Sequence, residues 1–209
     1  YSQQEPRLVV HYASLDQDTS VFDVKEAYED GDADFHTIVA KMADIPRSAA
    51  KTINLGLFYG MGKAKLQAEL GVSKDKAEEL FSIYHSRVPF VKSLTKSVSN
   101  RAQQRGQIRT LLGRLCRFHL WEPNTFGMHK ALPFEQAVQE HGPGIKRAYT
   151  YKALNKLIQG SAADMTKKSM LDLYKEGIVA HIQIHDELDV SVESPEQAKK
   201  IVEIMENAV

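Results

Sequence analysis

Two cations and an aromatic ring follow one another at helical spacing near residue 50 of the sequence. Four residues stand four positions apart: Arg47, Lys51, Leu55 and Tyr59. An α-helix turns about 100° per residue, so each step drifts only about 40° and the four side chains form one slowly turning stripe. Arginine offers phosphate a bidentate fork, lysine a point charge, and tyrosine a stacking face. The stripe suits a ligand with a polyphosphate and flat rings, although a surface helix with two solvated cations has the same spacing.

The residues around the stripe predict the helix that positions it. Pro46 suits the first turn of a helix, and Gly60 is a suitable stop. Ala50 and Ile53 lie on the flank of this helix that would pack inward. We therefore expect a helix over residues 47–59 that presents its cations on one face.

A second group with possible chemistry is His185-Asp186-Glu187. Apolar residues alternate on both sides of it over 179–192, which predicts a β-hairpin with these residues at its turn. Adjacent carboxylates are costly to hold together unless they are solvated or bound to a cation. The tip is therefore a candidate cation site, and a solvated acidic turn is the alternative.

Basic and amide side chains also gather along the chain. Asn155 and Gln159 lie one turn apart in a helix predicted over 147–175, so that both amides can face the same groove. Five arginines are also concentrated between residues 101 and 117. This basic cluster predicts a surface patch that follows a phosphate backbone, and a solvated basic face is the alternative. Its members are Arg101, Arg105, Arg109, Arg114 and Arg117.

The remaining pattern is mainly helical. Helices are expected over 20–28, 34–42, 73–84 and 90–104, with Ser73 as an N-cap. Ile108, Thr110 and Leu112 alternate as a strand would. The segment 119–144 reads as an irregular connection without metal-binding spacing.

Composition limits the class of protein. The chain has 209 residues, 43% hydrophobic and 26% charged, which is typical of a globular protein with one or two cores. A net charge of zero counts mildly against a free-standing nucleic-acid binder. The single Cys116 excludes a disulfide framework, and no signal peptide or membrane-spanning apolar run is present, so a cytoplasmic location is expected. The chain opens at Tyr1 and closes on an amphipathic stretch, so we expect a fragment of a longer protein.

The pattern Arg-x-x-x-Lys-x-x-x-(aromatic)-Gly-x-x-Tyr-Gly resembles the nucleotide-binding helix of the family A DNA polymerases, relatives of bacterial DNA polymerase I. The chain matches it at Arg47, Lys51, Gly56, Tyr59 and Gly60. It departs at Leu55, where the family usually has Phe or Tyr against the sugar of the nucleotide. Leu at this position resembles the phage-type members, and its effect on sugar selectivity is left open.

Three further motifs resemble the same family in the family's order. They are the first palm motif at 1–7, the Asn/Gln helix at 148–164 and the His-Asp-Glu hairpin at 185–187. Thr110 to Arg114 also resembles the family's Thr-x-x-Gly-Arg motif. The resemblance implies an α+β fold, with a palm of antiparallel strands and helices and an inserted, mainly helical fingers subdomain. The implied palm covers 1–30 and 151–209, the fingers cover 31–118, and an irregular connection covers 119–150.

The resemblance also implies roles for individual residues. Asp186, Glu187 and Lys51 would be catalytic, and Asp186 with the backbone carbonyl of Tyr1 would bind metal. A second metal-bridging Asp is expected immediately before Tyr1, so the isolated fragment is expected to be inactive. The nucleotide would be bound by Arg47, Lys51, Leu55, Tyr59, His36 and Glu5, and the DNA by Arg114, Asn155, Gln159 and His185.

The implied function is template-directed DNA synthesis with two Mg²⁺ ions, by transfer of a nucleotide from dNTP to a primer 3′-hydroxyl with release of pyrophosphate. The implied partners are primer-template DNA and dNTP, and the phage-like segments point to viral DNA replication in the host cytoplasm. The sequence identifies no processivity factor. One alternative is a catalytically inactive, polymerase-derived scaffold that binds template. Another is a metal-dependent nuclease, which would not need the stripe of Arg47, Lys51 and Tyr59.

Overall fold

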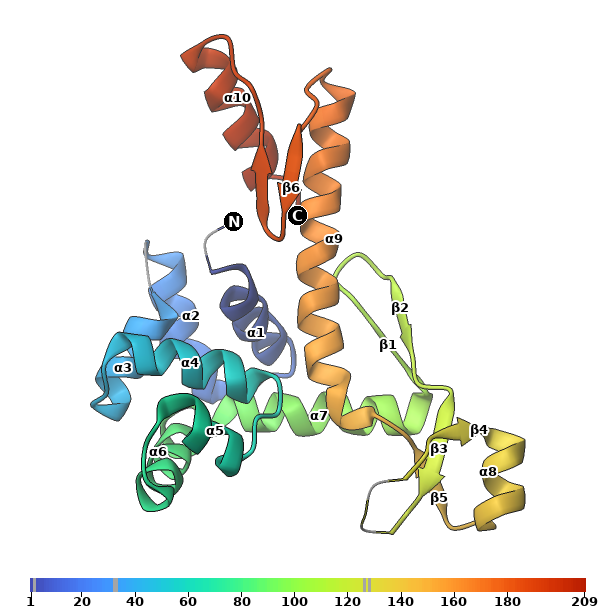
Figure 1. The fold of residues 1–209 in the computed structure, drawn as a ribbon. Helices are drawn as coiled ribbons and strands as arrows, with labels where there is room; N and C mark the ends of the chain where they lie inside the picture. Colours follow the sequence, from blue (N-terminus) through green and yellow to red (C-terminus); the bar gives the residue numbers. More distant parts are fainter. Residues whose placement is uncertain (2, 32–33, 126, 128) are drawn as a thin grey trace.

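The computed structural model describes residues 1, 3–31, 34–125, 127 and 129–209, so Ser2 of the first motif lies outside the described residues. Figure 1 shows a mainly helical molecule with small antiparallel sheets. The long helix α9 (Ala153–Lys175) runs through its middle. The remaining helices lie on both sides of α9 and at its two ends.

The first four helices carry most of the predicted nucleotide-binding residues. They are α1 (Gln4–Leu15), α2 (Phe22–Glu29), α3 (Phe35–Ala43) and α4 (Arg47–Phe58), with a short 3-10 turn, η1 (Thr19–Val21), before α2. Helix α4 begins directly after Pro46, as predicted, and Tyr59 is its C-cap. Asp34 is the N-cap of helix α3, and its side chain accepts a hydrogen bond from the His36 backbone N–H.

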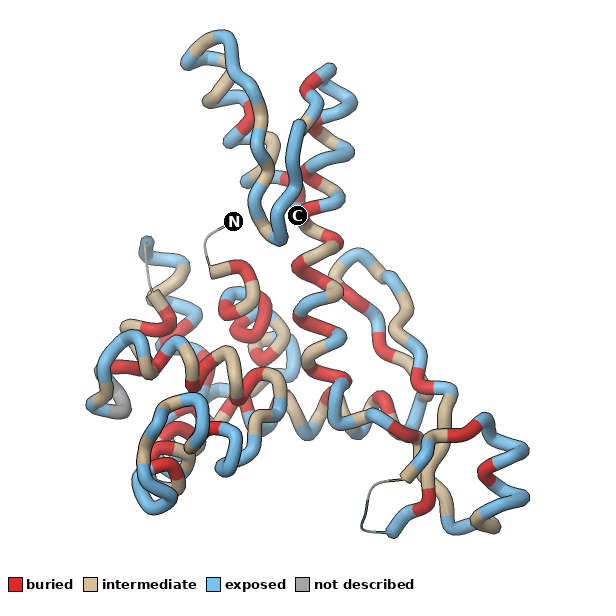
Figure 2. Tube along the Cα trace, in the orientation of Figure 1, coloured by how far each residue is buried: buried red, intermediate tan, exposed pale blue. Residues whose placement is uncertain are grey.

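Three more helices complete the helical body: α5 (Lys63–Leu70), α6 (Lys74–Arg87) and α7 (Pro89–Arg105). Ser73 caps α6 as expected. The main hydrophobic core lies where α1, α3, α4, α7 and α9 meet, and it is the red interior of Figure 2. Its fully buried side chains include Phe35, Ile53, Phe58, Phe90 and Ile158.

The strand predicted to run through Thr110 and Leu112 is shorter than expected. Strand β1 (Gln107–Arg109) pairs antiparallel with β2 (Leu115–Arg117). Between them the Gly113 N–H donates to the Thr110 carbonyl at 2.9 Å, and Gly113 has φ +86°. Glycine adopts this left-handed conformation without steric cost, so the chain turns where the alternation alone suggested a continuing strand.

The described residues of the segment expected to be an irregular connection include regular strands and a helix. Strands β4 (Leu132–Pro133), β3 (Leu120–Pro123) and β5 (Ile145–Arg147) form an antiparallel sheet in that order, and α8 (Phe134–His141) packs on it. The Arg147 guanidinium lies 4.5 Å from the Trp121 ring centre. Strands of two to four residues and frequent prolines left too little periodicity to reveal this unit.

Helix α9 begins six residues later than the predicted start at Arg147. Arg147 ends strand β5, and Tyr149 has a left-handed backbone at φ +62°. A 3-10 turn, η2 (Thr150–Lys152), then leads into α9. A left-handed residue cannot continue a right-handed helix, which accounts for the late start.

The C-terminal part forms a lobe at the far end of α9. Strand β6 (Ile182–Ile184) pairs with β7 (Glu187–Asp189), and α10 (Pro195–Glu206) follows. The sequence analysis placed Glu187 in the turn of the hairpin, but it is the first residue of β7. Leu173, Ile178 and Ile201 form a second, smaller core here, while Ile182 and Ile184 remain about half exposed.

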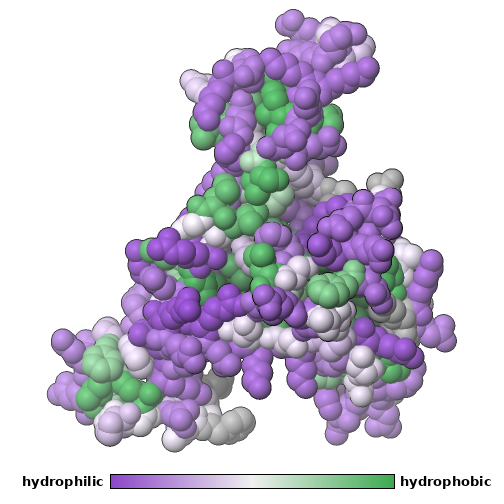
Figure 3. All heavy atoms as spheres, turned by 180° about the vertical axis from the view of Figure 1, so that it is seen from behind, coloured by the Kyte–Doolittle hydropathy of each residue, from purple (hydrophilic) through white to green (hydrophobic). Residues whose placement is uncertain are grey.

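The observed mixture of helices and small antiparallel sheets agrees with the predicted α+β class. Seen from behind, most of the surface is hydrophilic, with hydrophobic groups in the C-terminal lobe and in the unit that contains α8 (Figure 3). None of the described helices combines the length and the apolar composition that crossing a membrane requires.

Candidate functional site

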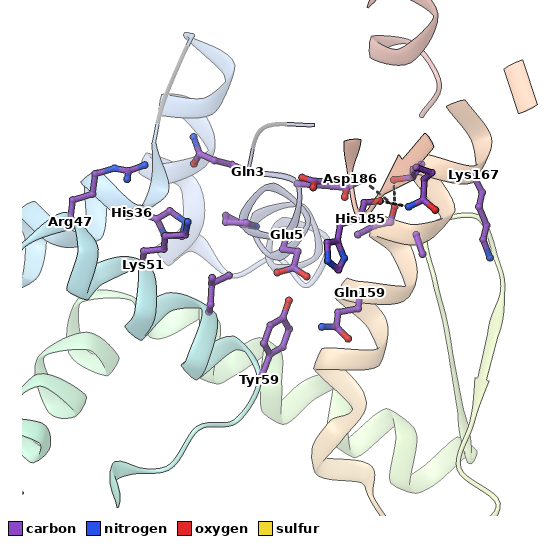
Figure 4. Close-up of a pocket in the computed structure, with 17 residues that line it drawn as sticks. Gln3, Glu5, His36, Arg47, Lys51, Tyr59, Gln159, Lys167, His185 and Asp186 are labelled. Atoms are coloured by element: carbon purple, nitrogen blue, oxygen red, sulfur yellow. Dashed lines mark hydrogen bonds between the residues drawn. The ribbon is translucent and has the colours of Figure 1, made fainter. Parts of the chain in front are cut away.

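A cleft of about 1060 Å³ opens between the body of helices and the C-terminal hairpin. It is lined by the start of α1, one face of α3 and α4, the middle of α9 and the hairpin tip. Nine residues predicted for the site meet in it: Glu5, His36, Arg47, Lys51, Leu55, Tyr59, Gln159, His185 and Asp186. In Figure 4 Arg47 and Lys51 of α4 lie on one side of the cleft and Asp186 lies on the other. We call the side with Arg47, Lys51 and His36 the cationic wall and the hairpin side with Asp186 the acidic wall.

Arg47 in the cationic wall forms an ion pair with Asp34. The Arg47 Nε donates to the Asp34 carboxylate at 2.5 Å. Burial alone would raise the pKa of Asp34, but hydrogen bonds from Arg47, Thr37 and the His36 N–H outweigh it and lower the pKa to about 2. Asp34 therefore stays ionised and fixes one edge of the Arg47 guanidinium, while Lys51 is exposed to the cleft without a carboxylate partner among the described residues.

His36 is held in this wall by a buried amide. Asn54 is fully buried, and its Nδ2 lies 3.0 Å from the His36 Nδ1. Burial lowers the pKa of His36, and the positive charges of Arg47 and Lys51 lower it further. The negative charge of Asp34 raises this pKa but does not outweigh them. The imidazole is therefore neutral at pH 7. If Nδ1 accepts from Asn54, the proton resides on Nε2, which is then a donor for the cleft.

Three side chains converge in the middle of the cleft. Glu5, Tyr59 and Gln159 point toward one another from α1, the end of α4 and α9 (Figure 4). Burial, with the neighbouring Glu5 carboxylate, raises the pKa of the Tyr59 hydroxyl. This hydroxyl is buried and faces the Glu5 carboxylate, so it stays neutral and can serve as a donor. Leu55 lies beside it as an apolar, half-buried surface.

Long-range contacts hold the acidic wall in place. The Tyr1 backbone nitrogen donates to the Asp186 backbone carbonyl at 2.9 Å, and the Tyr1 hydroxyl donates to the Met205 carbonyl at 2.6 Å. The Gln183 amide donates to the His185 carbonyl at 2.7 Å, and His185 has a left-handed backbone at φ +51°. The start of the chain is thereby attached to the hairpin tip, and Asp186 is turned into the cleft.

The described residues supply only part of a metal site. Asp186 lines the cleft, and its backbone carbonyl accepts a hydrogen bond from the Tyr1 nitrogen, so the two residues predicted as metal ligands are neighbours. Carboxylate and carbonyl oxygens suit Mg²⁺. However, no group of three His, Cys, Asp or Glu side chains within the described residues could hold a metal ion. Glu187, which was expected to assist Asp186, does not line the cleft.

Two predicted DNA-binding residues also lie outside the cleft. Arg114 is anchored to α9, with its Nε donating to Asp164 at 2.8 Å and its Nη2 donating to the Gly160 carbonyl at 2.6 Å. A Cβ at Gly160 would meet the Thr110 side chain at 2.8 Å, so glycine allows the β1–β2 turn to approach the helix. Asn155 lies one turn of α9 before Gln159, toward the α8 unit.

Some residues that shape the site were not among the predicted site residues. Asp34, Asn54 and Gln3 support the cationic wall. The Gln3 Oε1 accepts from the Phe35 N–H at 2.9 Å and from the Tyr28 hydroxyl at 3.0 Å. Asp34 could have been found as the N-cap two residues before His36. No local pattern marks Asn54, because its partner is 18 residues away.

Comparison with known proteins shows where the chain belongs. The model of the family "DNA polymerase family A" matches residues 1–209. The DNA-directed DNA polymerase of Pseudomonas phage M6 is 32% identical over 98% of this chain and 34% of its own length. DNA polymerase I of Helicobacter pylori is 30% identical over 100% of this chain and 22% of its own length.

A solved structure agrees with these relatives. The POL domain of Pol1 from M. smegmatis, in complex with DNA primer-template and dNTP, matches all of this chain and 36% of its own length, with a TM-score of 0.74 and 28% identity. The chain thus spans about a third or less of these relatives. The match over the whole chain, in sequence and in fold, shows that the chain belongs to DNA polymerase family A.

Proposed function

We propose that the native protein containing this chain is a template-directed DNA polymerase, which transfers a nucleotide from dNTP to a primer 3′-hydroxyl and releases pyrophosphate. The observation that carries this proposal is the cleft itself, in which Arg47 and Lys51 face Asp186 across a space of about 1060 Å³. A nucleotide with its triphosphate on the cations would bring its reacting phosphate toward the acidic wall. Membership of family A supports the same reaction.

The cationic wall binds the triphosphate in this proposal. Lys51 is exposed to the cleft, Arg47 keeps its two terminal nitrogens available beside Asp34, and His36 offers its Nε2–H. These groups neutralise the charge that develops as pyrophosphate leaves. Lys51 also donates a proton to the leaving pyrophosphate.

The middle of the cleft selects the nucleotide. Glu5 excludes ribonucleotides by crowding the 2′ position of the sugar, and Leu55 lies against the sugar. Tyr59 offers its ring to the base. The mutual approach of Glu5, Tyr59 and Gln159 supports this arrangement, because a carboxylate held beside the sugar would crowd a 2′-hydroxyl.

Asp186 and the Tyr1 carbonyl serve as metal ligands in the proposal, with Glu187 as an auxiliary carboxylate. When bound, two Mg²⁺ ions lower the pKa of the primer 3′-hydroxyl and neutralise the triphosphate. His185 lies near the primer end. Gln159, Asn155 and Arg114 contact the DNA, with the two amides in the minor groove, where acceptor positions depend little on sequence.

The phage relatives support a role in viral DNA replication, which would take place in the host cytoplasm. The test is extension of a primed template by the native protein with and without Mg²⁺, using correct and incorrect dNTPs. Template-directed, Mg²⁺-dependent extension is expected. Template binding without extension would instead favour the inactive scaffold, and strand cleavage without dNTP dependence would favour the nuclease.

A further inference from the structure

The proposed function assigns Arg114 to DNA but gives no role to the acid that holds it. Asp164 of α9 is only 7% exposed, and Arg114 is its one cationic partner among the described residues. The Arg114 Nε donates to the Asp164 carboxylate at 2.8 Å, while the Arg114 side chain itself is 47% exposed. Packing fixes the rotamer of a buried side chain, so this exposed cation is held by an acid that stays in one place.

Further contacts fix the β1–β2 turn against α9. The Thr110 hydroxyl also donates to the Asp164 carboxylate, and the Leu111 N–H donates to the Ser161 Oγ at 3.0 Å. Ser161 is fully buried, and the absence of a Cβ at Gly160 lets the Thr110 side chain approach the helix. Asp164 therefore receives hydrogen bonds from both ends of the turn and joins the turn to the helix.

The anchored guanidinium keeps one edge for a ligand. Its Nε and Nη2 donate to Asp164 and to the Gly160 carbonyl, while its Nη1 has no hydrogen bond to any described residue. Three of the five N–H groups of Arg114 therefore remain, on the edge that its two terminal nitrogens share. This edge can offer a phosphate two parallel hydrogen bonds, in a direction that Asp164 determines.

The anchor of Arg114 lies beside the cleft. Gly160 directly follows Gln159, which lines the cleft, and Asp164 directly follows Ala163, which also lines it. Figure 1 shows the β1–β2 turn beside the middle of α9. DNA that leaves the cleft along α9 would therefore meet the free edge of the guanidinium.

We infer that Asp164 is a positioning residue for DNA, which holds the Arg114 guanidinium so that its free edge meets a backbone phosphate. The inference rests on the proposed function, which brings primer-template DNA to α9. Removal of a negative charge near DNA ordinarily strengthens binding, because the phosphates repel that charge. Loss of Asp164 should instead weaken binding, because Arg114 then loses its orientation.

The test measures the affinity of the native protein for primer-template DNA over a range of salt concentrations. Asp164→Asn and Arg114→Ala should each lower the affinity about tenfold and make the slope of log K against log[salt] shallower by about one. In an Arg114→Ala background, Asp164→Asn should have no further effect. Asp172→Asn changes another acid of α9, which pairs with Lys168 and Lys175, and this matched control should not lower the affinity.

A second variant keeps the test decisive if Asp164→Asn is unstable. Arg114→Lys keeps the charge, but a single ammonium held by Asp164 and Gly160 lacks the paired N–H groups of a guanidinium edge, so it should lose most of the affinity that Arg114→Ala loses.

Three results would each overturn the inference. They are unchanged or tighter binding by Asp164→Asn, an equal effect of Asp164→Asn with and without Arg114, and full affinity of Arg114→Lys. A native protein that binds no primer-template DNA would refute the proposed function and the inference with it, which is a different result from DNA binding without a role for Asp164.

Discussion

Helices α3 and α4, which carry His36, Arg47 and Lys51, pack into the large hydrophobic core, whereas the hairpin that carries Asp186 is supported by a much smaller one. Ile53, Leu57 and Phe58 fix α4 from beneath and are at most 5% exposed. Among the described residues, the buried members of the second core are only Leu173, Ile178 and Ile201. The two walls of one cleft are therefore stabilised to very different degrees.

This difference gives the two walls different freedom. The cationic wall is held by its core and by short polar contacts such as the Asp34–Arg47 pair. The acidic wall depends on the second core and on the attachment of Tyr1 to Asp186 and Met205. Local opening draws on regions with few buried contacts, so the hairpin should open more readily than α4. Each of the following changes tests one wall against the other.

After the loss of Asp186 itself, the largest effect is expected from Lys51→Ala in the native protein. Removing the proposed proton donor and triphosphate cation should lower kcat by about 10²–10⁴-fold, while primer-template affinity stays within a few-fold. Single-turnover incorporation and DNA binding measure the two quantities. Lys41→Ala removes an exposed cation of the neighbouring helix α3, and it should leave both unchanged. A loss of DNA binding equal to the loss in rate would contradict the assignment of Lys51 to the nucleotide.

A smaller effect is expected from Leu173→Ala, which truncates the most buried side chain of the second core. Such a cavity typically costs about 2–5 kcal/mol. Amide hydrogen exchange should therefore speed up in β6, β7 and α10 and remain slow in α4. Leu171→Ala, at a half-exposed position of the same helix, is the control. Equal acceleration in α4 would show that the two regions unfold as one unit.

The sequence predicted local features of the fold and the site better than contacts between distant residues. Local signals mark α4 at both ends, since Pro46 starts it and Gly60 follows it, and its stripe needs no partner to be recognised. The links that complete its wall join distant residues, such as Asn54 with His36 and Gln3 with Phe35, and no local period reports them. The unit around β3 and the late start of α9 were missed because short strands and one left-handed Tyr149 leave no repeating pattern.

A smaller effect is expected from Asn54→Ala, which removes the buried partner of His36. Loss of this hydrogen bond should lower the free energy of unfolding by about 1–3 kcal/mol and raise the KM for dNTP several-fold. In a His36→Ala background the KM effect should vanish while the loss of stability persists. Asn100→Ala, at an exposed position of α7, serves as the control. A KM effect of unchanged size without His36 would refute the role of Asn54 in orienting that ring.

The smallest effect is expected from Asp34→Asn. The pKa of Asp34 is about 2 in the folded chain, below its ordinary value of 3.8, so its ionised form stabilises the fold above about pH 4. This contribution is lost as the pH falls through about 2. Because the pair with Arg47 is partly exposed, we expect less than about 1 kcal/mol. Urea unfolding at pH 6 and pH 3 should show a steeper loss in the unaltered chain than in the variant, and identical pH dependence would contradict the assignment.

The most direct test of the division between the two walls is a comparison of Asp186→Ala with Arg47→Ala in the native protein. Primer-template affinity, the KM for dNTP and the rate of incorporation are measured for both variants in Mg²⁺. Asp186→Ala should bind primer-template normally and incorporate no nucleotide, whereas Arg47→Ala should retain slow incorporation with a raised KM for dNTP. Incorporation that survives without Asp186 would contradict the assignment of the chemistry to the hairpin wall.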